Sequence, residues 1–187
     1  MEDYKKILVL YKLKEVYRVC HVPGRRESSA EHTWGCMLLA DYFLCKMDLK
    51  LNRNRVMDIL LYHELVEVEA GDTPVIDKEA LKTKAYREKI GFEALKEKMP
   101  QELVAGYSEL YKEYKECKTP EAKFANAIDK LDPIIHSLEH PEAWKEWDLS
   151  EADVREHKER HLLYSEEFMK VLNELIEYLK DNDFIKH

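Results

Sequence analysis

Apolar residues recur at intervals of three and four along most of this chain, so that long segments carry an apolar face opposite a polar one. This period is typical of α-helices with one buried side. The strict alternation of apolar and polar residues that is typical of strands is absent, and we predict an all-α fold. The segments with the helical period are residues 3–19, 30–47, 52–70, 77–98, 101–116, 120–138 and 151–181.

Turn and capping residues separate these segments. Pro23-Gly24 interrupts the pattern after the first helix, and we expect residues 25–29 to form a polar connection to the second. The helix over 30–47 is apolar over much of its circumference, so we expect it near the centre of the fold. Side chains that cap helix N-termini stand at four expected starts: Ser28 or Ser29, Asn52 or Asn54, Thr119 before Pro120, and Ser150.

The length of the chain fits one domain. With 187 residues, of which 45% are hydrophobic and 36% charged, it can bury a core of its own. Internal repeats, low-complexity tracts and linkers are absent from the sequence. We therefore expect a single domain over residues 1–187, built as a bundle of about six to eight helices.

Charge and cysteine usage restrict the partners and the compartment. The formal net charge of −8 argues against a protein that binds nucleic acid polymers. A small phosphorylated substrate remains compatible, because a bound divalent cation can supply positive charge. The four cysteines form no Cys-x-x-Cys pair, which indicates reduced thiols in a cytoplasmic protein. No apolar run approaches the roughly eighteen residues of a membrane span, and no signal peptide opens the chain, so we expect no association with membranes.

Polar residues that can bind metal interrupt three apolar helices. His32 opens one of them, His63-Glu64 closes another, and Asp129 lies within a third. A single polar residue in such a place is more often a satisfied core group than a ligand. Three of them that can converge in a helical bundle favour a metal site. Histidine and carboxylate ligands suit Mn, Fe, Co, Ni, Zn or Mg, so the ligand types alone do not select the ion.

Other helical chemistries fit less well. A zincin motif fails because Glu67 stands where the second histidine is required, and the ferritin-like Glu-x-x-His pairs are absent. Five glycines provide no P-loop or dinucleotide fingerprint. We expect His157 and His161 on a solvated charged face. Trp144 and Trp147 flank a charged turn, and we expect them to pack within the protein.

Three segments carry longer patterns. They are RESSAEH at residues 26–32, YHELVEVEAGDTP at 62–74, and TPEAKF at 119–124 followed by Asp129-Lys130. Their order and spacing resemble the HD superfamily of metal-dependent phosphohydrolases, and within it the small branch that contains the 5′-deoxynucleotidases. The resemblance covers about residues 8–140, and it implies an HD-domain helical bundle with that core and a C-terminal helix at about 151–181.

The resemblance also implies roles for individual residues. One divalent metal ion would be held by His32, His63, Glu64 and Asp129. Glu67 would orient or deprotonate the attacking water, because a carboxylate one turn beyond a ligand can reach it. Asp72 would contact the sugar 3′-hydroxyl or help to protonate the leaving oxygen, and Arg18 would hold the phosphate. The family also suggests a homodimer, which the apolar stripe of the last helix permits.

The activity expected from this resemblance is removal of the 5′-phosphate from (deoxy)nucleoside 5′-monophosphates. Two positions depart from the family: Glu64 stands where aspartate is usual, and Val19 follows Arg18 where the bacterial deoxynucleotidases carry tryptophan. Two alternatives therefore remain open. One is an HD-fold hydrolase of a cyclic or polyphosphorylated nucleotide, and the other is a catalytically impaired nucleotide-binding regulatory protein.

Overall fold

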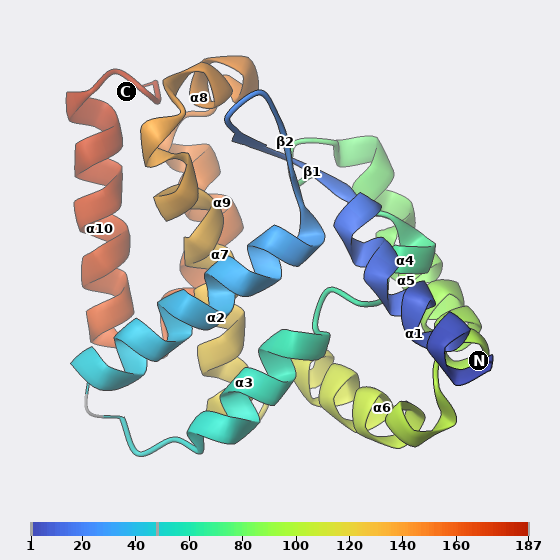
Figure 1. Ribbon diagram of the computed structural model, residues 1–187. Coiled ribbons are helices and arrows are strands. Elements are labelled where there is room, and N and C mark those ends of the chain that lie inside the picture. Colours follow the sequence, from blue (N-terminus) through green and yellow to red (C-terminus); the bar gives the residue numbers. More distant parts are fainter. Residues whose placement is uncertain (1, 48, 187) are drawn as a thin grey trace.

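The computed structural model describes residues 2–47 and 49–186, which form a mostly helical fold with one small hairpin (Figure 1). The predicted helical class is confirmed. The elements are α1 (Glu2–Tyr11), a 3₁₀ turn (Lys12–Glu15), β1 (Tyr17–Val22), β2 (Arg25–Ser28), α2 (Ser29–Lys46), α3 (Arg53–Tyr62), α4 (Glu67–Ala70), α5 (Lys78–Lys98), α6 (Gln101–Glu116), α7 (Pro120–His136), a 3₁₀ turn (Ser137–Glu139), α8 (Pro141–Trp147), α9 (Glu151–Leu162) and α10 (Glu166–Asp181).

Helix α7 lies at the centre of the fold. It packs against α2, α3, α6, α9 and α10. Its side chains Phe124, Ile128 and Leu131 are fully buried, together with Leu60 of α3 and Phe168 of α10. Burying a large apolar side chain stabilises a fold by about 1.5–3 kcal/mol, so this cluster fixes the position of every helix that touches α7.

The hairpin β1–β2 replaces the end of the predicted first helix. The helix predicted over 3–19 forms as α1 and the following 3₁₀ turn, but it does not reach residue 19. The prediction of a polar connection over 25–29 was wrong, because β1 and β2 pair in an antiparallel register that joins Tyr17 to Ser28 and Val22 to Arg25. Pro23-Gly24 forms the turn, with Gly24 at φ +81°. The extended backbone of β1 directs the Arg18 side chain towards the interior, where it is only 13% exposed.

The capping predictions were correct at the second helix. Ser28 caps α2 by accepting a hydrogen bond from the Glu31 amide, and the Glu31 side chain accepts one from the Ser28 amide. This reciprocal pair is a capping box. Because β2 ends at Ser28, the box fixes the angle between the hairpin and α2, and it places His32 in the first buried turn of the helix.

The predicted helix over 52–70 is interrupted at residues 63–66. Asn52 caps its start as expected, but α3 ends at Tyr62 and α4 begins at Glu67. The Leu60 carbonyl, which would accept the Glu64 amide in a continuing α-helix, accepts a hydrogen bond from His63 Nδ1 at 2.7 Å. The chain proceeds with tighter bonds, such as Glu67 N–H to Glu64 O at 2.9 Å.

Helix α4 and the loop after it are held by α5. Gly91 lies so close to Ala70 that an added Cβ would stand 3.2 Å from the Ala70 Cβ. Arg87 donates hydrogen bonds to the Ala70 carbonyl (2.8 Å) and to the Thr73 hydroxyl (2.7 Å). Gly71, at φ +71°, ends α4 and directs the chain into the loop that carries Asp72. These contacts fix the segment that carries the predicted catalytic carboxylates.

The C-terminal part differs from the prediction. Residues 141–147 form α8, and the predicted helix over 151–181 is divided into α9 and α10 because Ser165 caps a new helix. The two helices pack side by side (Figure 1). The apolar stripe of α10 is buried within the protein, so it is not available to a partner chain. In the described part of the chain, no helix is long and apolar enough to span a membrane.

Candidate active site

Side chains from three separate parts of the chain meet in the interior of the protein. His32 comes from α2, His63 follows the last turn of α3, and Asp129 lies on α7. His32 Nε2 is 3.1 Å from Asp129 Oδ1, and His63 Nε2 is 4.0 Å from the same oxygen. All three residues are buried. The structure therefore brings together three of the four predicted metal ligands, and it adds Cys36, whose ligand atom completes a group within 4.8 Å of one another.

The hydrogen bonds around this cluster fix the orientation of the two imidazole rings. His63 Nδ1 donates to the Leu60 carbonyl, which can only accept. His32 Nδ1 donates to Asp132 Oδ2 at 2.7 Å. In the neutral His63 ring, Nε2 then carries a lone pair that points into the cluster. His32 Nε2 lies 3.1 Å from Asp129 Oδ1, and although burial opposes a positive charge, hydrogen bonds to Asp129 and Asp132 raise the pKa of His32 well above its usual value, so a metal ion bound here would displace the proton from Nε2. Such partners orient metal-binding histidines in many proteins.

Asp129 is oriented in the same way. Its Oδ2 accepts hydrogen bonds from the Tyr114 hydroxyl (2.5 Å) and from Lys130 Nζ (2.6 Å). Its Oδ1 remains turned towards the two histidines. Burial opposes ionisation of Asp129, but the charge of Lys130 and the hydrogen bond from His32 lower its pKa well below the usual value. The carboxylate is therefore ionised inside the protein.

The cluster fits a divalent cation. His63 Nε2 is buried and has no hydrogen-bond partner among the described residues. Its lone pair faces Asp129 Oδ1 at 4.0 Å, and buried acceptors that face one another are costly unless a cation lies between them. Imidazole nitrogens and a carboxylate oxygen are ligands that transition metals accept. Burial lowers the pKa of His63, which keeps the ring neutral for binding metal. Burial also raises the pKa of Cys36 to about 12, so its sulfur stays a thiol in the absence of metal.

The Glu64 carboxylate lies next to the cluster, beside His63. Its Oε1 lies 3.7 Å from His63 Nε2, and its Oε2 accepts a hydrogen bond from Arg18 Nη1 at 3.0 Å. Burial works against the charge on Glu64, but His63 and Arg18 lower its pKa to about 2. The ligand atoms of His32, Cys36, His63 and Asp129 lie within 4.8 Å of one another, and the Glu64 carboxylate lies outside this group. Its metal-binding role stays a prediction.

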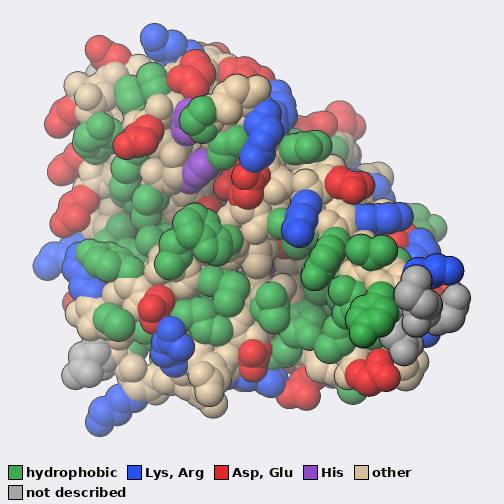
Figure 2. Space-filling model, viewed as in Figure 1, with side chains coloured by type: hydrophobic (Ala, Val, Ile, Leu, Met, Phe, Trp, Pro, Cys, Tyr) green, Lys and Arg blue, Asp and Glu red, His purple; other side chains and the backbone are tan. Residues whose placement is uncertain are grey.

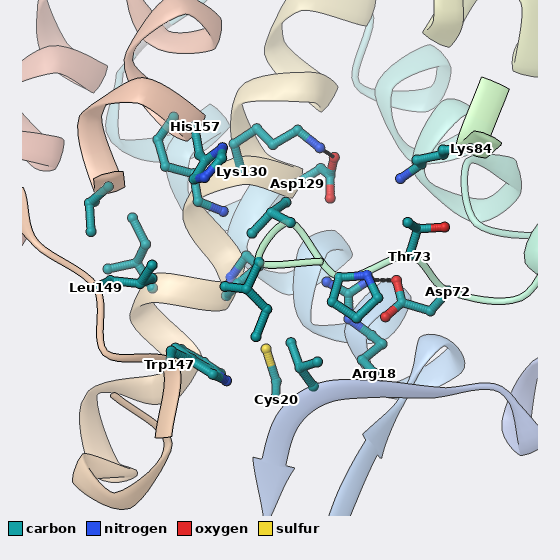
Figure 3. A pocket seen from close by; sticks show the side chains of 18 of the residues that line it. Arg18, Cys20, Asp72, Thr73, Lys84, Asp129, Lys130, Trp147, Leu149 and His157 are labelled. Atoms are coloured by element: carbon teal, nitrogen blue, oxygen red, sulfur yellow. Dashed lines mark hydrogen bonds and ion pairs between the residues drawn. The ribbon is translucent and has the colours of Figure 1, made fainter. Parts of the chain in front are cut away.

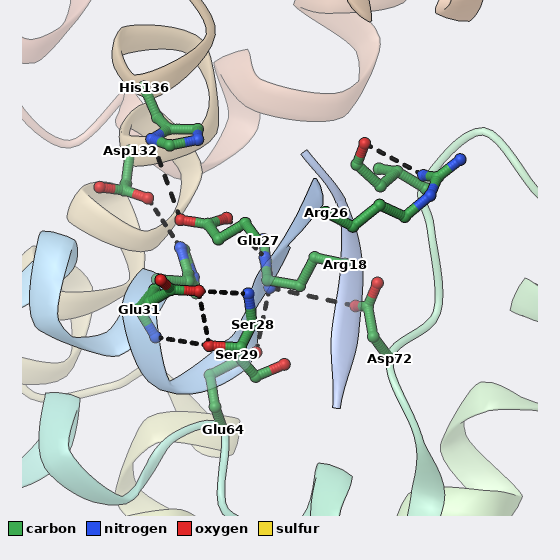
Figure 4. Close-up of polar contacts among 12 residues, drawn as sticks. Arg18, Arg26, Glu27, Ser28, Ser29, Glu31, Glu64, Asp72, Asp132 and His136 are labelled. Carbon is green, nitrogen blue, oxygen red and sulfur yellow. Dashed lines mark hydrogen bonds and ion pairs between the residues drawn. The ribbon is translucent and has the colours of Figure 1, made fainter. Parts of the chain in front are cut away.

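Arg18 lies among three carboxylates (Figure 4). Besides Glu64, it lies 3.4 Å from Glu27 Oε2 and 4.0 Å from Asp72 Oδ1. Its positive charge is therefore largely matched by groups of the protein itself.

Glu67 and Asp72 stand at the wall of the same site. Glu67 is the first residue of α4, and its Oε2 accepts a hydrogen bond from Ser29 Oγ at 2.7 Å. Burial, with the charges of Glu64 and Asp72, raises the pKa of Glu67 well above its usual value. Burial also raises the pKa of Asp72, although Arg18 opposes this. A raised pKa suits a carboxylate that accepts a proton near neutral pH.

A pocket of about 890 Å³, part of which is open to solvent, connects this site to the C-terminal helices. In Figure 3, Asp72, Thr73 and Lys84 lie at one end of the pocket, and Trp147 and Leu149 lie at the other. Between them, residues of α7 and α9 face residues of β1. The pocket thus offers charged groups beside the metal cluster and an apolar surface farther away, formed by Pro133, Ile134, Trp144, Trp147, Leu149 and Val154.

Several residues of the site escaped the sequence analysis. Cys36 and Asp132 could have been found, because Cys36 stands four residues after His32 on one helix face and Asp132 stands one turn after Asp129. Lys158 and His157 of α9 line the pocket, so the expectation of a solvated face was wrong for this turn. His161 is half-buried and donates to Asn126 Oδ1 at 2.6 Å.

The two tryptophans form an edge-to-face pair with ring centroids 5.2 Å apart. Trp144 is buried, and its indole N–H donates to the Ser137 carbonyl at 2.9 Å. The prediction that they pack within the protein was therefore correct, and both also line the pocket.

Comparison with known proteins places this arrangement in a family. A family model described as "HD domain" matches residues 10–170. The chain is 31% identical to "5'-deoxynucleotidase HDDC2" of Xenopus laevis over 130 residues, which are 70% of this chain and 62% of that protein. It is 29% identical to "5'-deoxynucleotidase hdd1" of Schizosaccharomyces pombe over 136 residues, 70% of this chain and 67% of that protein. The matched region thus spans about three fifths of the length of the frog relative.

Solved structures agree with this result. A predicted metal-dependent phosphohydrolase from Magnetospirillum magnetotacticum superposes with a TM-score of 0.84 at 28% identity, covering 100% of this chain and 95% of that one. A conserved hypothetical protein from Pyrococcus furiosus superposes with a TM-score of 0.62 at 25% identity, covering 92% and 98%. The resemblance inferred from the three sequence segments is confirmed at the level of the family.

Proposed function

Because the chain belongs to the HD-domain family, we propose that it is a metal-dependent phosphomonoesterase that converts (deoxy)nucleoside 5′-monophosphates to nucleoside and phosphate. One observation carries the proposal: a single pocket joins Asp129 of the buried His/Asp cluster, three further carboxylates and an apolar surface. The buried cluster suits a phosphate ester, and the apolar surface suits a nucleobase. The names of the frog and yeast relatives support the same substrate class.

The residues that would hold one divalent ion are His32, His63 and Asp129, with Glu64 as the fourth. When bound there, the ion would lower the pKa of a coordinated water and polarise a phosphoryl oxygen. The chain supplies the orientation: Asp132, the Leu60 carbonyl and Lys130 fix the rings and the carboxylate before substrate arrives. The candidate ions for this ligand set are Mn, Co, Mg, Ni, Zn and Fe.

Glu67 is the proposed proton acceptor. Ser29 Oγ donates to one of its oxygens, and a side-chain hydrogen bond with Glu64 keeps Glu67 beside the proposed metal ligands, where it would take a proton from the attacking water. Its raised pKa fits this role, because burial makes the neutral, proton-bearing form accessible. In the reaction, the water oxygen bonds to phosphorus, the ester P–O bond breaks, and the leaving 5′-oxygen takes up a proton.

Asp72 and Arg18 are the proposed substrate contacts beside the reacting bond. Asp72 lines the pocket and has a raised pKa, which suits a group that shares a proton with the leaving oxygen or bonds to the sugar 3′-hydroxyl. Arg18 holds Glu64 and Asp72 in place and lines the pocket, where it can also contact the phosphate.

A phosphate-release assay tests this proposal. Purified protein loaded separately with Mn, Co, Mg, Ni and Zn is offered all common nucleoside 5′-monophosphates, together with cyclic and polyphosphorylated nucleotides. Release of inorganic phosphate from the monophosphates is the expected result. Turnover restricted to cyclic or polyphosphorylated nucleotides would overturn the substrate class. Nucleotide binding without turnover by any metal form would indicate a regulatory protein, for which Glu64→Asp should restore hydrolysis.

A homodimer is part of the proposal. Hydrophobic side chains gather on the face that α1 and α2 present (Figure 2). Three of them form one stripe of α2: Trp34 is 67% exposed, Leu38 53% and Tyr42 55%. An exposed apolar surface of this kind marks interaction sites, and it replaces the α10 stripe as the proposed contact. Light scattering should report a dimer for the unmodified protein and a monomer for Leu38→Glu, whereas Tyr86→Glu on α5 should not change the mass.

We also assign the protein to the cytoplasm. All four cysteines are free thiols, and Cys20 and Cys36 are buried. Free thiols are typical of a reducing compartment. Fluorescence microscopy of the tagged full-length protein in its own cell tests the assignment, and enrichment in a secreted or membrane fraction would contradict it.

A further inference from the structure

Lys158 differs from the other cations that line the pocket. It lies on α9, next to His157 and one turn after Val154. No carboxylate or other group forms a hydrogen bond or ion pair with its ammonium group among the described residues. Among the described residues, the buried polar atoms that lack a hydrogen-bond partner do not include Lys158 Nζ, so this unpaired nitrogen is accessible to solvent. The ammonium group is therefore reachable from the pocket and unpaired.

The other basic groups of the pocket already have partners. Lys130 Nζ bonds Asp129 at 2.6 Å, and Arg18 Nη1 bonds Glu64 at 3.0 Å. Lys84 Nζ lies 3.7 Å from Glu88. A phosphate that relied on one of these three would compete with a carboxylate of the protein. Lys158 can bind an anion without breaking an existing contact.

The surroundings make this free cation unusual. Burial and the charge of Lys130 lower the pKa of Lys158 to about 8, while Asp129 opposes this. The group still carries its proton at neutral pH, but it lacks both full hydration and a counter-ion. A desolvated charge without a partner is costly to the fold, so its position in a pocket points to a ligand that supplies the missing negative charge.

The charge balance of the site supports the same conclusion. Four carboxylates, those of Glu64, Glu67, Asp72 and Asp129, line the pocket. A phosphate monoester that enters this space adds further negative charge. Arg18 and Lys130 are matched by the carboxylates, so one more cation within reach of Asp129 lowers the repulsion that the substrate meets.

We propose that Lys158 is a substrate-binding residue whose ammonium group holds the non-bridging oxygens of the phosphoryl group, on the side of the pocket formed by α9. The identity of the substrate rests on the proposed function, whereas binding of an anion at Lys158 does not. Phosphate recognition then depends on a helix that follows the last motif residue, Asp129, in sequence.

The test uses three variants of the full chain. Lys158→Met removes the charge and keeps the apolar stem, Lys158→Arg keeps the charge, and Lys170→Met changes an exposed lysine of α10 as the matched control. Two quantities are measured on metal-loaded protein: the thermal shift produced by inorganic phosphate, and KM and kcat for the best nucleoside monophosphate. Metal content is determined for each variant.

Lys158→Met should weaken phosphate binding and raise KM by about tenfold or more, because a charge-assisted hydrogen bond is lost. Its metal content should equal that of the unmodified protein, and Lys158→Arg should recover most of the phosphate-induced shift. Phosphate binding that is equal in Lys158→Met and the unmodified protein overturns the proposal. If phosphate binding depends on Lys158 but no monophosphate is hydrolysed, the inference stands and the proposed function fails.

Discussion

The two walls of the pocket are built on different principles. The first wall includes Glu64 and Asp129 and is backed by the two histidines of the cluster. Internal partners hold its groups in place: Asp132 holds His32, the Leu60 carbonyl holds His63, and Lys130 holds Asp129. On the wall formed by α8 and α9, the lining groups are apolar, except for His157 and the unpaired Lys158. The first wall is organised before any ligand binds, whereas the second is complementary to an incoming molecule. Under the proposed function, the first wall prepares the reaction and the second selects the substrate.

The largest expected effect is on the organised wall. Asp129→Ala removes the carboxylate shared by both histidines and should abolish both metal binding and phosphate release. The loss of rate should exceed the roughly 10²–10³-fold that removal of a single transition-state hydrogen bond costs. Elemental analysis and the phosphate assay measure the two effects. The exposed Asp58→Ala of α3 serves as the control, and full activity of Asp129→Ala would remove the metal cluster from the mechanism.

Glu67→Gln separates proton transfer from metal binding. The amide keeps the size of the side chain but cannot accept a proton, so kcat should fall by about 10²–10⁴-fold while metal content is unchanged. The matched control is Glu69→Gln, two residues later, whose carboxylate pairs with Lys98 on the surface. If kcat is unaffected by Glu67→Gln, another group takes the proton.

Asp132→Asn tests whether internal partners organise the first wall. Metal affinity should fall by about 10–100-fold, since a neutral amide holds the His32 ring less firmly. Gly35→Ala should act in the same direction, because its Cβ would stand 2.8 Å from Asp132 Oδ1 and displace it. Gly106→Ala, which meets nothing within 4 Å, is the control. Unchanged metal affinity in both variants would show that the cluster orders itself without Asp132.

The smallest expected effect is the pH dependence of phosphate binding at Lys158, on the second wall. The pKa of Lys158 is about 8, and the charged or titratable groups that act on it are Lys130, Asp129, Cys20 and Arg18. Below this pH the protonated amine binds anions, and above it the neutral amine does not, so phosphate affinity should fall up to about tenfold per pH unit as pH rises from 8. Inhibition by inorganic phosphate measures this. Lys158→Met should lack the decline, and an identical decline in that variant would assign it to another group.

The sequence predicted those parts of the site that depend on local patterns. The N-cap at Ser28, the helix end before Gly71 and the cluster residues His32, His63 and Asp129 each leave a signal within a few residues. A polar residue inside an apolar helix is recognisable because its helix must be buried. Pairs one turn apart, such as His32 with Cys36, follow the same rule.

Tertiary structure alone decided the rest. The Tyr17–Val22 strand shows no regular alternation and exists because Arg25–Ser28 pairs with it. The break at residues 63–66 is accompanied by packing of α4 against α5, which lies farther along the chain. Lys158 stands in a run of charged residues that reads as a solvated surface, and it is drawn into the pocket only because α9 packs against α7. Periodicity identifies the buried face of a helix, but which charged residue meets a cavity depends on contacts between segments that are distant in sequence.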